Sequence, residues 1–258
     1  MDNERNGHDE DVRDLSVFFP AHNEAESLAR TVTSAVTALE RLGLQDLEII
    51  LVDDGSTDGT AAIAQRLAAK DSRIRLVHHP MNRGYGAALR SGFAAARRDW
   101  IFYTDSDGQF DLSDIDRLLP YARDFDAVVG YRIRRSDHPM RRVNQALWSG
   151  LVRRMLGVDV RDVDCAFKLV RRASLERIGP LVSEGAVISA ELVVKLQRSG
   201  ARLTQVGVPH HPRVAGKPSG GNPHVIARAF RELFQLRRAL RTSSSVKTQV
   251  TASDASPG

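Results

Sequence analysis

Residues 105–109 place two carboxylates and an amide directly after an apolar run. The run is 100–103, and Asp105, Asp107 and Gln109 follow it at alternate positions. An apolar run that ends in turn-forming residues is typical of a buried strand followed by a tight turn. Oxygen ligands of this kind suit Mg²⁺ or Mn²⁺ and suit softer metals poorly. The sequence therefore predicts a divalent-cation site here, unless the segment is only a turn rich in turn-forming residues.

A second pair of carboxylates, Asp53 and Asp54, follows the apolar run 47–52. That run has no polar alternation, which is typical of a strand buried on both faces of a parallel sheet. Ligands of open α/β sheets bind beyond the carboxyl ends of the strands, so we expect both acidic segments at one site. A carboxylate there can accept a hydrogen bond from a nucleobase N–H or a ribose hydroxyl. Asp54 can equally cap the helix that follows, as can Ser56 and Asp58.

The elements that must position these side chains alternate between strand and helix. Strands are expected at 15–19, 47–52, 75–78, 100–104, 126–130, 166–170 and 202–208. Helices are expected between Asn23 and Gly43, after Thr60, at 87–97, 113–121, around 147–156, at 172–178, 187–199 and 224–241. This alternation predicts an α/β fold with a Rossmann-like, mostly parallel sheet flanked by helices.

The chain is expected to contain one large domain with short appendages. Residues 1–14 are polar and acidic, without the apolar region of a signal peptide, and are expected to be disordered. The domain is expected over 15–223, with a nucleotide-binding half at 15–109 and an acceptor half at 110–223, followed by a basic amphipathic helix at 224–241 and a disordered tail at 242–258. No window approaches the roughly 18 consecutive apolar residues that a membrane span requires.

The composition is that of a soluble globular protein, with 42% apolar and 27% charged residues among 258. A net charge of +5 suits an anionic ligand, an anionic membrane surface or nucleic acid. Nucleic acid is disfavoured because the positive charge is confined to late segments without interleaved aromatic residues. The single cysteine, Cys165, excludes an internal disulfide and fits a reducing cytosol.

Five ordered segments carry a resemblance to a known family: FFPAHNEAESL, ILVDDGSTDGT, NRGYGAAL, YTDSDGQFD and VVGYR. They resemble the inverting family 2 glycosyltransferases of GT-A fold. Within that family the chain is most similar to the dolichyl-phosphate mannose synthase-like branch, the polyprenyl-phosphate glycosyltransferases, over about residues 15–215. The resemblance implies a metal-dependent enzyme that moves a hexose from a GDP- or UDP-linked donor to an acceptor, with a polyprenyl phosphate as the expected acceptor.

The resemblance also implies three groups of site residues. Nucleotide contacts are expected from Pro20, Ala21, Asn23, Glu24, Asp53 and Arg83, with Asp54, Gly84 and Ser106 beside them. The metal ligands are expected to be Asp105, Asp107 and Gln109. Phosphate groups of the donor or acceptor are expected to contact Arg132, Arg213 and Lys217. The expected catalytic residues are Asp107, Arg132 and Asp164.

The chemistry follows from the charges. A metal stabilises the negative charge that grows on the departing nucleoside diphosphate, and attack from the opposite face inverts the anomeric centre. A lipid phosphate is already an anion and needs no base, whereas a hydroxyl acceptor needs one, for which Asp164, Asp162 and Glu191 are candidates. Other branches of the family show a Gln-x-x-Arg-Trp signature for this task, and its absence here favours phosphate.

Several alternatives remain open from the sequence. The enzyme can instead act on a small hydroxylated molecule of secondary metabolism, or the chain can bind a nucleotide sugar without catalysis. The expected helix 224–241 carries an apolar stripe (Ile226, Phe230, Leu233, Leu240) and a basic stripe (Arg228, Arg231, Arg238, Arg241). Such a helix can lie on the cytoplasmic face of a membrane, dock on its own domain, or contact a partner chain in a homo-oligomer.

Overall fold

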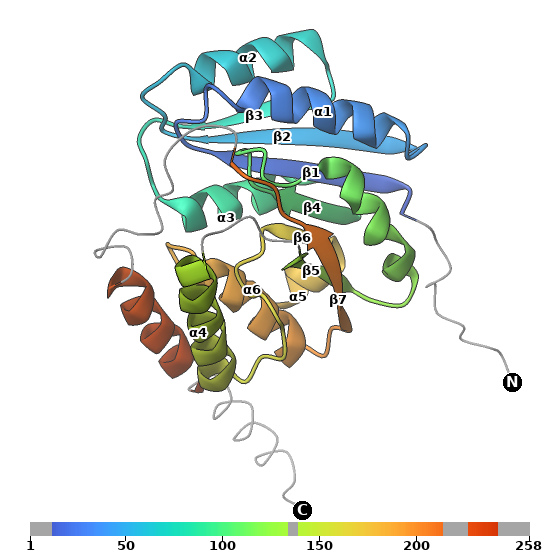
Figure 1. The fold of residues 1–258 in the computed structure, drawn as a ribbon. Coiled ribbons are helices and arrows are strands. Elements are labelled where there is room, and N and C mark those ends of the chain that lie inside the picture. Colours follow the sequence, from blue (N-terminus) through green and yellow to red (C-terminus); the bar gives the residue numbers. More distant parts are fainter. Residues whose placement is uncertain (1–11, 134–138, 214–226, 242–258) are drawn as a thin grey trace, which may run out of the picture.

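A seven-stranded sheet forms the centre of the protein (Figure 1). The structure, a computed structural model, describes residues 12–133, 139–213 and 227–241, with the first four residues of the second range given by backbone alone. The strands are β1 (Asp14–Ala21), β2 (Asp46–Asp54), β3 (Ile74–His79), β4 (Trp100–Thr104), β5 (Ala127–Ile133), β6 (Phe167–Arg171) and β7 (Leu203–Pro209), in the order β3-β2-β1-β4-β6-β5-β7.

Six of the seven strands share one direction. β6 runs antiparallel to both β4 and β5, while every other pairing in the sheet is parallel. The carboxyl ends of β1, β2, β4 and β5 therefore meet at one edge of the sheet, and β6 begins at that same edge. The strand order and directions confirm the expected α/β fold with a mostly parallel sheet. They also bring the acidic sequence motifs together at one edge.

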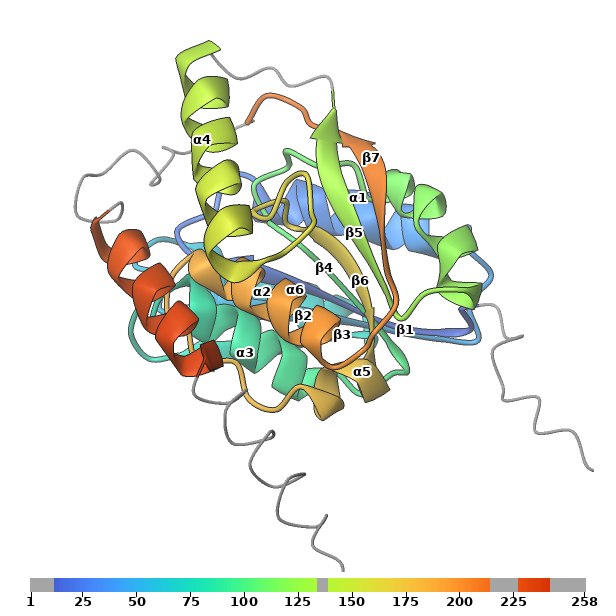
Figure 2. The same ribbon diagram turned by 90° about the horizontal axis from the view of Figure 1, so that it is seen from below.

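Helices cover both faces of the sheet (Figures 1 and 2). The helices are α1 (Leu28–Glu40), α2 (Thr60–Lys70), α3 (Tyr85–Ala95), α4 (Pro139–Leu156), α5 (Arg172–Arg177) and α6 (Val187–Arg198), and the 3₁₀ turns are η1 (Leu112–Arg117) and η2 (Leu119–Arg123). Leu28 and Ile115 belong to the core on one face, and Leu89 and Leu192 to the core on the other. The sheet is thus buried on both sides, which explains the continuous apolar runs of its strands.

Two expected helices differ from the structure. The first helix begins at Leu28 and not beside Asn23, because Asn23 has a left-handed backbone (φ +55°) that cannot continue into a helix. The helix expected over 113–121 is replaced by η1 and η2. Pro120 lacks an N–H group and so interrupts α-helical hydrogen bonding in that segment.

A third layer consists of α4 and the helix formed by residues 227–241, which stand side by side in both ribbon views (Figures 1 and 2). Leu233, Leu236 and Leu240 of helix 227–241 are buried in one cluster with Val152 of α4 and Val193 of α6. Part of the apolar stripe expected from the sequence therefore docks on the domain itself. Ile226, Lys217 and most of the segments expected to be disordered lie outside the described residues.

Across the ranges that the structure describes, none of the helices has the length and apolar character needed to cross a bilayer.

Candidate functional site

The acidic turn, residues 105–109, follows β4 at the edge where the strand ends gather. Asp105 Oδ1 accepts a hydrogen bond of 3.0 Å from the Tyr85 hydroxyl, and Asp107 Oδ1 accepts one of 3.0 Å from the backbone N–H of Gln109. Burial and, after it, the negative charge of Asp107 raise the pKa of Asp105 to about 7, against lowering by the hydrogen bond from Tyr85 and by the charges of Arg132 and Lys168. The two carboxylates are thus close enough to repel each other in a desolvated place.

A cationic side chain, Arg213, lies beside these carboxylates. Arg213 Nη1 lies 3.6 Å from Asp107 Oδ2, and another nitrogen of Arg213 forms an ion pair with Glu24. A divalent cation would relieve the repulsion between Asp105 and Asp107 in the same way, so this pair of oxygen donors fits Mg²⁺ or Mn²⁺. Within residues 12–133, 139–213 and 227–241, however, no three or more His, Cys, Asp or Glu side chains form a preformed metal-binding group.

The expected third metal ligand, Gln109, is joined to the segment that carries Arg213. Gln109 Nε2 donates to the carbonyl of His211 at 3.2 Å, and the backbone N–H of His211 donates to the carbonyl of Gln109 at 2.9 Å. These bonds hold residues 210–213 over the acidic turn. Ligation of a metal by Gln109 stays a prediction.

The loops after β1 and β2 are tied together by Asn23. Its Oδ1 accepts the N–H of Thr57 at 2.8 Å, and its own N–H donates to Ser56 Oγ at 3.0 Å. Ser106 joins the acidic turn to the same place, since its Oγ donates to the carbonyl of Pro20 at 2.9 Å. Ala21 pairs with Asp53 in the sheet register. These residues therefore fix the relative positions of three strand ends.

Asp53 and Asp54 are both buried, and each is held by a histidine of β3. Asp53 Oδ2 lies 2.7 Å from His78 Nδ1, and its Oδ1 accepts the N–H of Ser56 at 3.3 Å. Asp54 Oδ1 lies 2.7 Å from His79 Nδ1. The Asp53 side chain is only 1% exposed, so a nucleotide can reach it only if the half-exposed His78 ring moves or shares the carboxylate.

The carboxylate of Asp54 organises the glycine loop, residues 82–86. Its two oxygens accept the backbone N–H groups of Arg83 at 2.9 Å and of Gly84 at 2.8 Å. Gly84 has φ +91°, a conformation that favours glycine. The Arg83 side chain is exposed beside the site. Capping of α2, the other possibility for this region, is provided by Asp58, whose Oδ1 accepts the N–H of Thr60 at 2.9 Å.

On the other side of the acidic turn, Arg132 at the end of β5 forms a bidentate ion pair with Asp162. Both Nε–Oδ2 and Nη2–Oδ1 distances are 2.7 Å. Asp164 lies in the same segment, where burial and the charge of Asp162 raise its pKa to about 6 against lowering by Arg132, Lys168 and a hydrogen bond from Trp148. A carboxylate that titrates near neutral pH is suited to accept a proton.

Lys168 is a functional candidate that the sequence reasoning missed. It is fully buried in β6, and its Nζ donates to the carbonyls of Val163 and Cys165. Its charge lowers the pKa values of Asp105 and Asp164. The signal was a lysine inside the apolar run 166–170, because a strand expected to be buried seldom contains an unpartnered cation.

The third candidate base, Glu191, is placed elsewhere and has a different use. It is fully buried in α6, and its carboxylate accepts the N–H groups of Val182 at 3.0 Å and Ser183 at 2.7 Å. Burial alone would raise its pKa, but hydrogen bonds from Lys195, Ser183 and Val182 lower the pKa overall. Glu191 therefore acts as a structural anchor for residues 180–186.

The geometry brings acidic residues, strand ends and cations together at one edge of the sheet. Residues 16–179, more than half of the chain, match the protein family described as glycosyl transferase family 2. The chain belongs to glycosyl transferase family 2.

Relatives of this family 2 glycosyltransferase include proteins named for polyprenyl-phosphate acceptors. Glycosyltransferase AglD of Haloferax volcanii is 36% identical over 208 residues, covering 78% of this chain and 33% of AglD. The undecaprenyl-phosphate 4-deoxy-4-formamido-L-arabinose transferase of Aeromonas hydrophila is 31% identical, covering 84% of this chain and 65% of the relative. The dolichyl-phosphate beta-glucosyltransferase of Saccharomyces cerevisiae is 25% identical, covering 76% and 66%. The chain thus spans about one third to two thirds of the length of these relatives.

Among solved structures, glucosyl-3-phosphoglycerate synthase from Mycobacterium tuberculosis shares the fold of this family 2 glycosyltransferase. That structure was determined with Mn²⁺, uridine diphosphate and phosphoglyceric acid. The TM-score is 0.67 with 20% sequence identity, covering 87% of this chain and 78% of that one.

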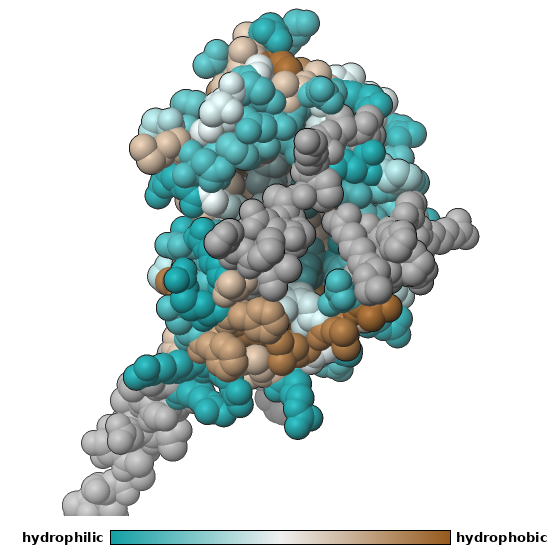
Figure 3. Space-filling model, turned by 60° about the vertical axis from the view of Figure 1, so that its left-hand side comes forward, coloured by the Kyte–Doolittle hydropathy of each residue, from teal (hydrophilic) through white to brown (hydrophobic). Residues whose placement is uncertain are grey.

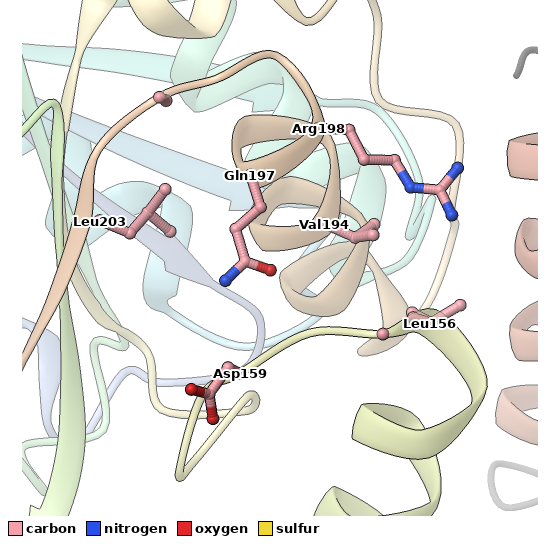
Figure 4. Close-up of a pocket in the computed structure, with 8 residues that line it drawn as sticks. Leu156, Asp159, Val194, Gln197, Arg198 and Leu203 are labelled. Carbon is pink, nitrogen blue, oxygen red and sulfur yellow. The ribbon is translucent and has the colours of Figure 1, made fainter.

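The protein has a cavity of about 410 Å³ away from the candidate functional site (Figure 4). It lies at the beginning of β7, among Leu156, Asp159, Gln197 and Leu203, whereas the acidic turn lies at the opposite edge of the sheet. Arg198 also lines the cavity, and its guanidinium donates to the carbonyl of Leu240 at 2.7 Å. The cavity therefore does not belong to the candidate site.

Proposed function

We propose that this chain is a metal-dependent inverting glycosyltransferase that moves a hexose from a nucleotide sugar to a polyprenyl phosphate. The observation that carries the proposal is that Asp107 lies beside Glu24 and Arg213, with Asp105 close to Asp107, at the edge where β1, β2 and β4 end. Family membership supports the reaction class. We further propose that residues 15–109 bind the nucleotide and 110–223 bind the acceptor.

Donor binding would use the three strand ends that Asn23 and Ser106 tie together. A divalent cation held by Asp105, Asp107 and Gln109 would neutralise the diphosphate and stabilise it as a leaving group. Asp53 would accept a hydrogen bond from the base or ribose, within a loop framework that Asp54 shapes by holding Arg83 and Gly84. Both UDP- and GDP-linked hexoses are candidates.

Acceptor binding would use the cations on the far side of the acidic turn. Arg132 of β5 lies there beside Asp162, Arg213 of the segment after β7 lies beside Asp107, and the fully buried Lys168 of β6 adds positive charge from inside the protein. A phosphate monoester carries its own negative charge, so its oxygen needs orientation and no deprotonation. The names of relatives from Aeromonas hydrophila and Saccharomyces cerevisiae, which specify undecaprenyl and dolichyl phosphate, agree with this acceptor class.

One observation favours a hydroxyl acceptor as the second candidate. Asp164 has a pKa raised to about 6 by burial and by Asp162, which makes it the base that a hydroxyl acceptor needs. Asp162 is engaged by Arg132 and Glu191 by backbone N–H groups, so Asp164 is the remaining one of the three carboxylates expected from the sequence.

We also propose that the chain contacts a membrane surface through an apolar patch on the third layer. The patch consists of Val143 and Leu147 of α4 and Phe230 and Phe234 of helix 227–241, which are 54%, 68%, 40% and 59% exposed. Figure 3 shows apolar side chains gathered on this face, with hydrophilic residues around them. Exposed arginines of the same helix, Arg231, Arg238 and Arg241, suit anionic lipid headgroups.

The experiment is a transfer assay with the purified chain, Mn²⁺ or Mg²⁺, and labelled UDP-glucose or GDP-mannose. Undecaprenyl phosphate and dolichyl phosphate in detergent form one arm, and a panel of soluble alcohols and sugars forms the other. The proposal expects label in the lipid fraction only. Label transferred only to soluble hydroxyl acceptors would support the second candidate, and a donor that binds without being consumed by any acceptor would contradict both.

A further inference from the structure

The bridging loop, residues 180–186, joins α5 to α6 and contacts three separate parts of the chain. Its hydrogen bonds reach the glycine loop, α6 and helix 227–241. The proposed chemistry assigns no role to this loop or to the helix residues that hold it. Its contacts nevertheless extend from the apolar patch to the acidic turn.

The first contact joins the bridging loop to the glycine loop. The backbone N–H of Gly86 donates to the carbonyl of Glu184 at 2.7 Å. A Cβ atom at Gly86 would lie 2.2 Å from the carbonyl oxygen of Ser183, so glycine is required for this approach. Arg90 of α3 also donates to the carbonyl of Ser183. The start of α3 therefore rests directly on the bridging loop.

The second contact fixes the bridging loop from α6. Glu191 accepts the N–H groups of Val182 and Ser183 inside the protein, as described above. Lys195 lies 2.8 Å from the Glu191 carboxylate and donates to the carbonyl of Pro180 at 2.6 Å. The first half of the loop is therefore held by a fully buried carboxylate of α6.

The third contact comes from helix 227–241. Glu232 is 7% exposed, and its Oε2 accepts the N–H of Gly185 at 3.0 Å. Arg228 donates to Glu232 Oε1 at 2.9 Å and pairs with the Glu184 side chain. A buried carboxylate that accepts a backbone N–H and a guanidinium is a strong directional link. The second half of the bridging loop is therefore held by this helix.

This series of contacts ends at the acidic turn, because the hydroxyl of Tyr85, the neighbour of Gly86, donates a hydrogen bond to Asp105. We infer that Glu232 is a positioning residue for the nucleotide site, acting through the bridging loop on Gly86, Tyr85 and Asp105. The inference rests on the proposed function for the identity of the ligand. It makes helix 227–241, which also carries part of the apolar patch, a determinant of donor affinity.

The test uses the full chain and two measurements. Calorimetry with UDP and with GDP, each with Mn²⁺, measures nucleotide affinity, and hydrogen exchange over residues 82–88 measures the order of the glycine loop. Glu232→Ala is expected to weaken nucleotide affinity about fivefold or more and to speed exchange over 82–88. Glu232→Gln keeps an oxygen acceptor for the N–H of Gly185 and is expected to remain close to the parent chain. Unchanged affinity and exchange in Glu232→Ala would overturn the inference.

Glu48→Ala is the matched control for loss of a buried carboxylate. Glu48 accepts the backbone N–H of Arg97 at 2.6 Å and the Ser16 hydroxyl at 2.7 Å near the beginning of β1, at the opposite edge of the sheet. This variant is expected to lower thermal stability and to leave nucleotide affinity unchanged. If Glu232→Ala does not fold, Arg228→Ala removes the half-exposed partner of the same link, and the same two readouts apply.

The proposed function and the inference about Glu232 can be contradicted separately. A parent chain that binds neither UDP nor GDP with Mn²⁺ would contradict the proposed function, whereas hydrogen exchange over 82–88 would still report the effect of Glu232. A parent chain that binds a nucleotide, with Glu232→Ala binding it equally well and exchanging equally slowly, would contradict only the inference.

Discussion

Arg132 and Asp162 are joined by two parallel hydrogen bonds of 2.7 Å, with both side chains largely buried. Arg132 Nε and Nη2 are therefore both engaged by Asp162. The pair fixes the end of β5 against the segment that precedes β6. An ion pair with this geometry holds the guanidinium of Arg132 against Asp162 and prevents it from pairing with another carboxylate nearby.

Asp162→Asn is expected to destabilise the fold by about 3 kcal/mol, because removing one partner leaves a buried charge without compensation. The measurement is the free energy of unfolding in urea. Glu40→Gln is the control, since Glu40 is 53% exposed in its pair with Arg73 and such surface pairs contribute about 0–1 kcal/mol. Equal losses in the two variants would show that the Arg132 pair is no stronger than a surface pair.

Asp164→Asn is expected to stabilise the protein at pH 8. The pKa of Asp164 is about 6 in the folded chain, above its ordinary value of 3.8, because of burial and of Asp162. A raised carboxyl pKa contributes stability below pH 3.8 that is lost as pH rises through 6, so the ionised carboxylate costs about 3 kcal/mol at pH 8.

Melting temperatures measured from pH 4 to pH 8 test this. The variant is expected to melt higher than the parent at pH 8, with the difference shrinking toward zero at pH 4. A difference that is independent of pH would contradict the raised pKa. In the transfer assay, a kcat for hydroxyl acceptors that falls below pH 6 only in the parent would identify Asp164 as a base.

Gly86→Ala is expected to destabilise the fold by about 2 kcal/mol, because the added Cβ would lie 2.2 Å from the carbonyl oxygen of Ser183. Gly150→Ala in α4 is the matched control, since a Cβ there meets no atom within 4 Å. Alanine is expected to stabilise that helix by about 1 kcal/mol. Urea denaturation compares the two variants, and a stabilising Gly86→Ala would contradict the close approach of the bridging loop.

Phe230→Ser combined with Phe234→Ser is expected to weaken binding to anionic phosphatidylglycerol vesicles about tenfold. The two rings are 40% and 59% exposed, and burying aromatic area in a lipid interface contributes about 2 kcal/mol per ring when complete. Vesicle sedimentation measures the partition. Tyr121→Ser removes a 43% exposed ring of η2 as a control. Vesicle binding that survives the double change would exclude this face as the membrane contact.

The strands were predictable from the sequence because burial on both faces leaves apolar runs. Runs such as 47–52 and 100–104 lie within β2 and β4, and their acidic ends lie at one edge as parallel strands require. The direction of β6 was not predictable. The segment before it, Asp162–Cys165, lies at the edge where the parallel strands end, so β6 begins at that edge and runs antiparallel to its neighbours. Nothing in the short run 166–170 indicates this.

Site contacts between distant elements were less predictable than the elements themselves. The sequence leaves Asp54 open between a helix cap and a ligand contact, whereas its hold on the glycine loop depends on how β2 and β3 pair and shows only in the structure. A ligand contact by Asp54 stays a prediction. Tyr85 and His78 contact acidic residues, and the charge of Lys168 acts on Asp105, through strand register and helix docking, which a single sequence does not show.

In the proposed function, Asp105 and Asp107 hold a cation that binds a nucleoside diphosphate. The most direct measurement is calorimetry of UDP and GDP with Mn²⁺, and with EDTA, in the parent chain and in Asp107→Asn. We expect at least one nucleotide to bind the parent only with metal, and Asp107→Asn, at an unchanged melting temperature, to lose at least about tenfold in affinity. Metal-dependent nucleotide binding of equal strength in Asp107→Asn would contradict the proposed function.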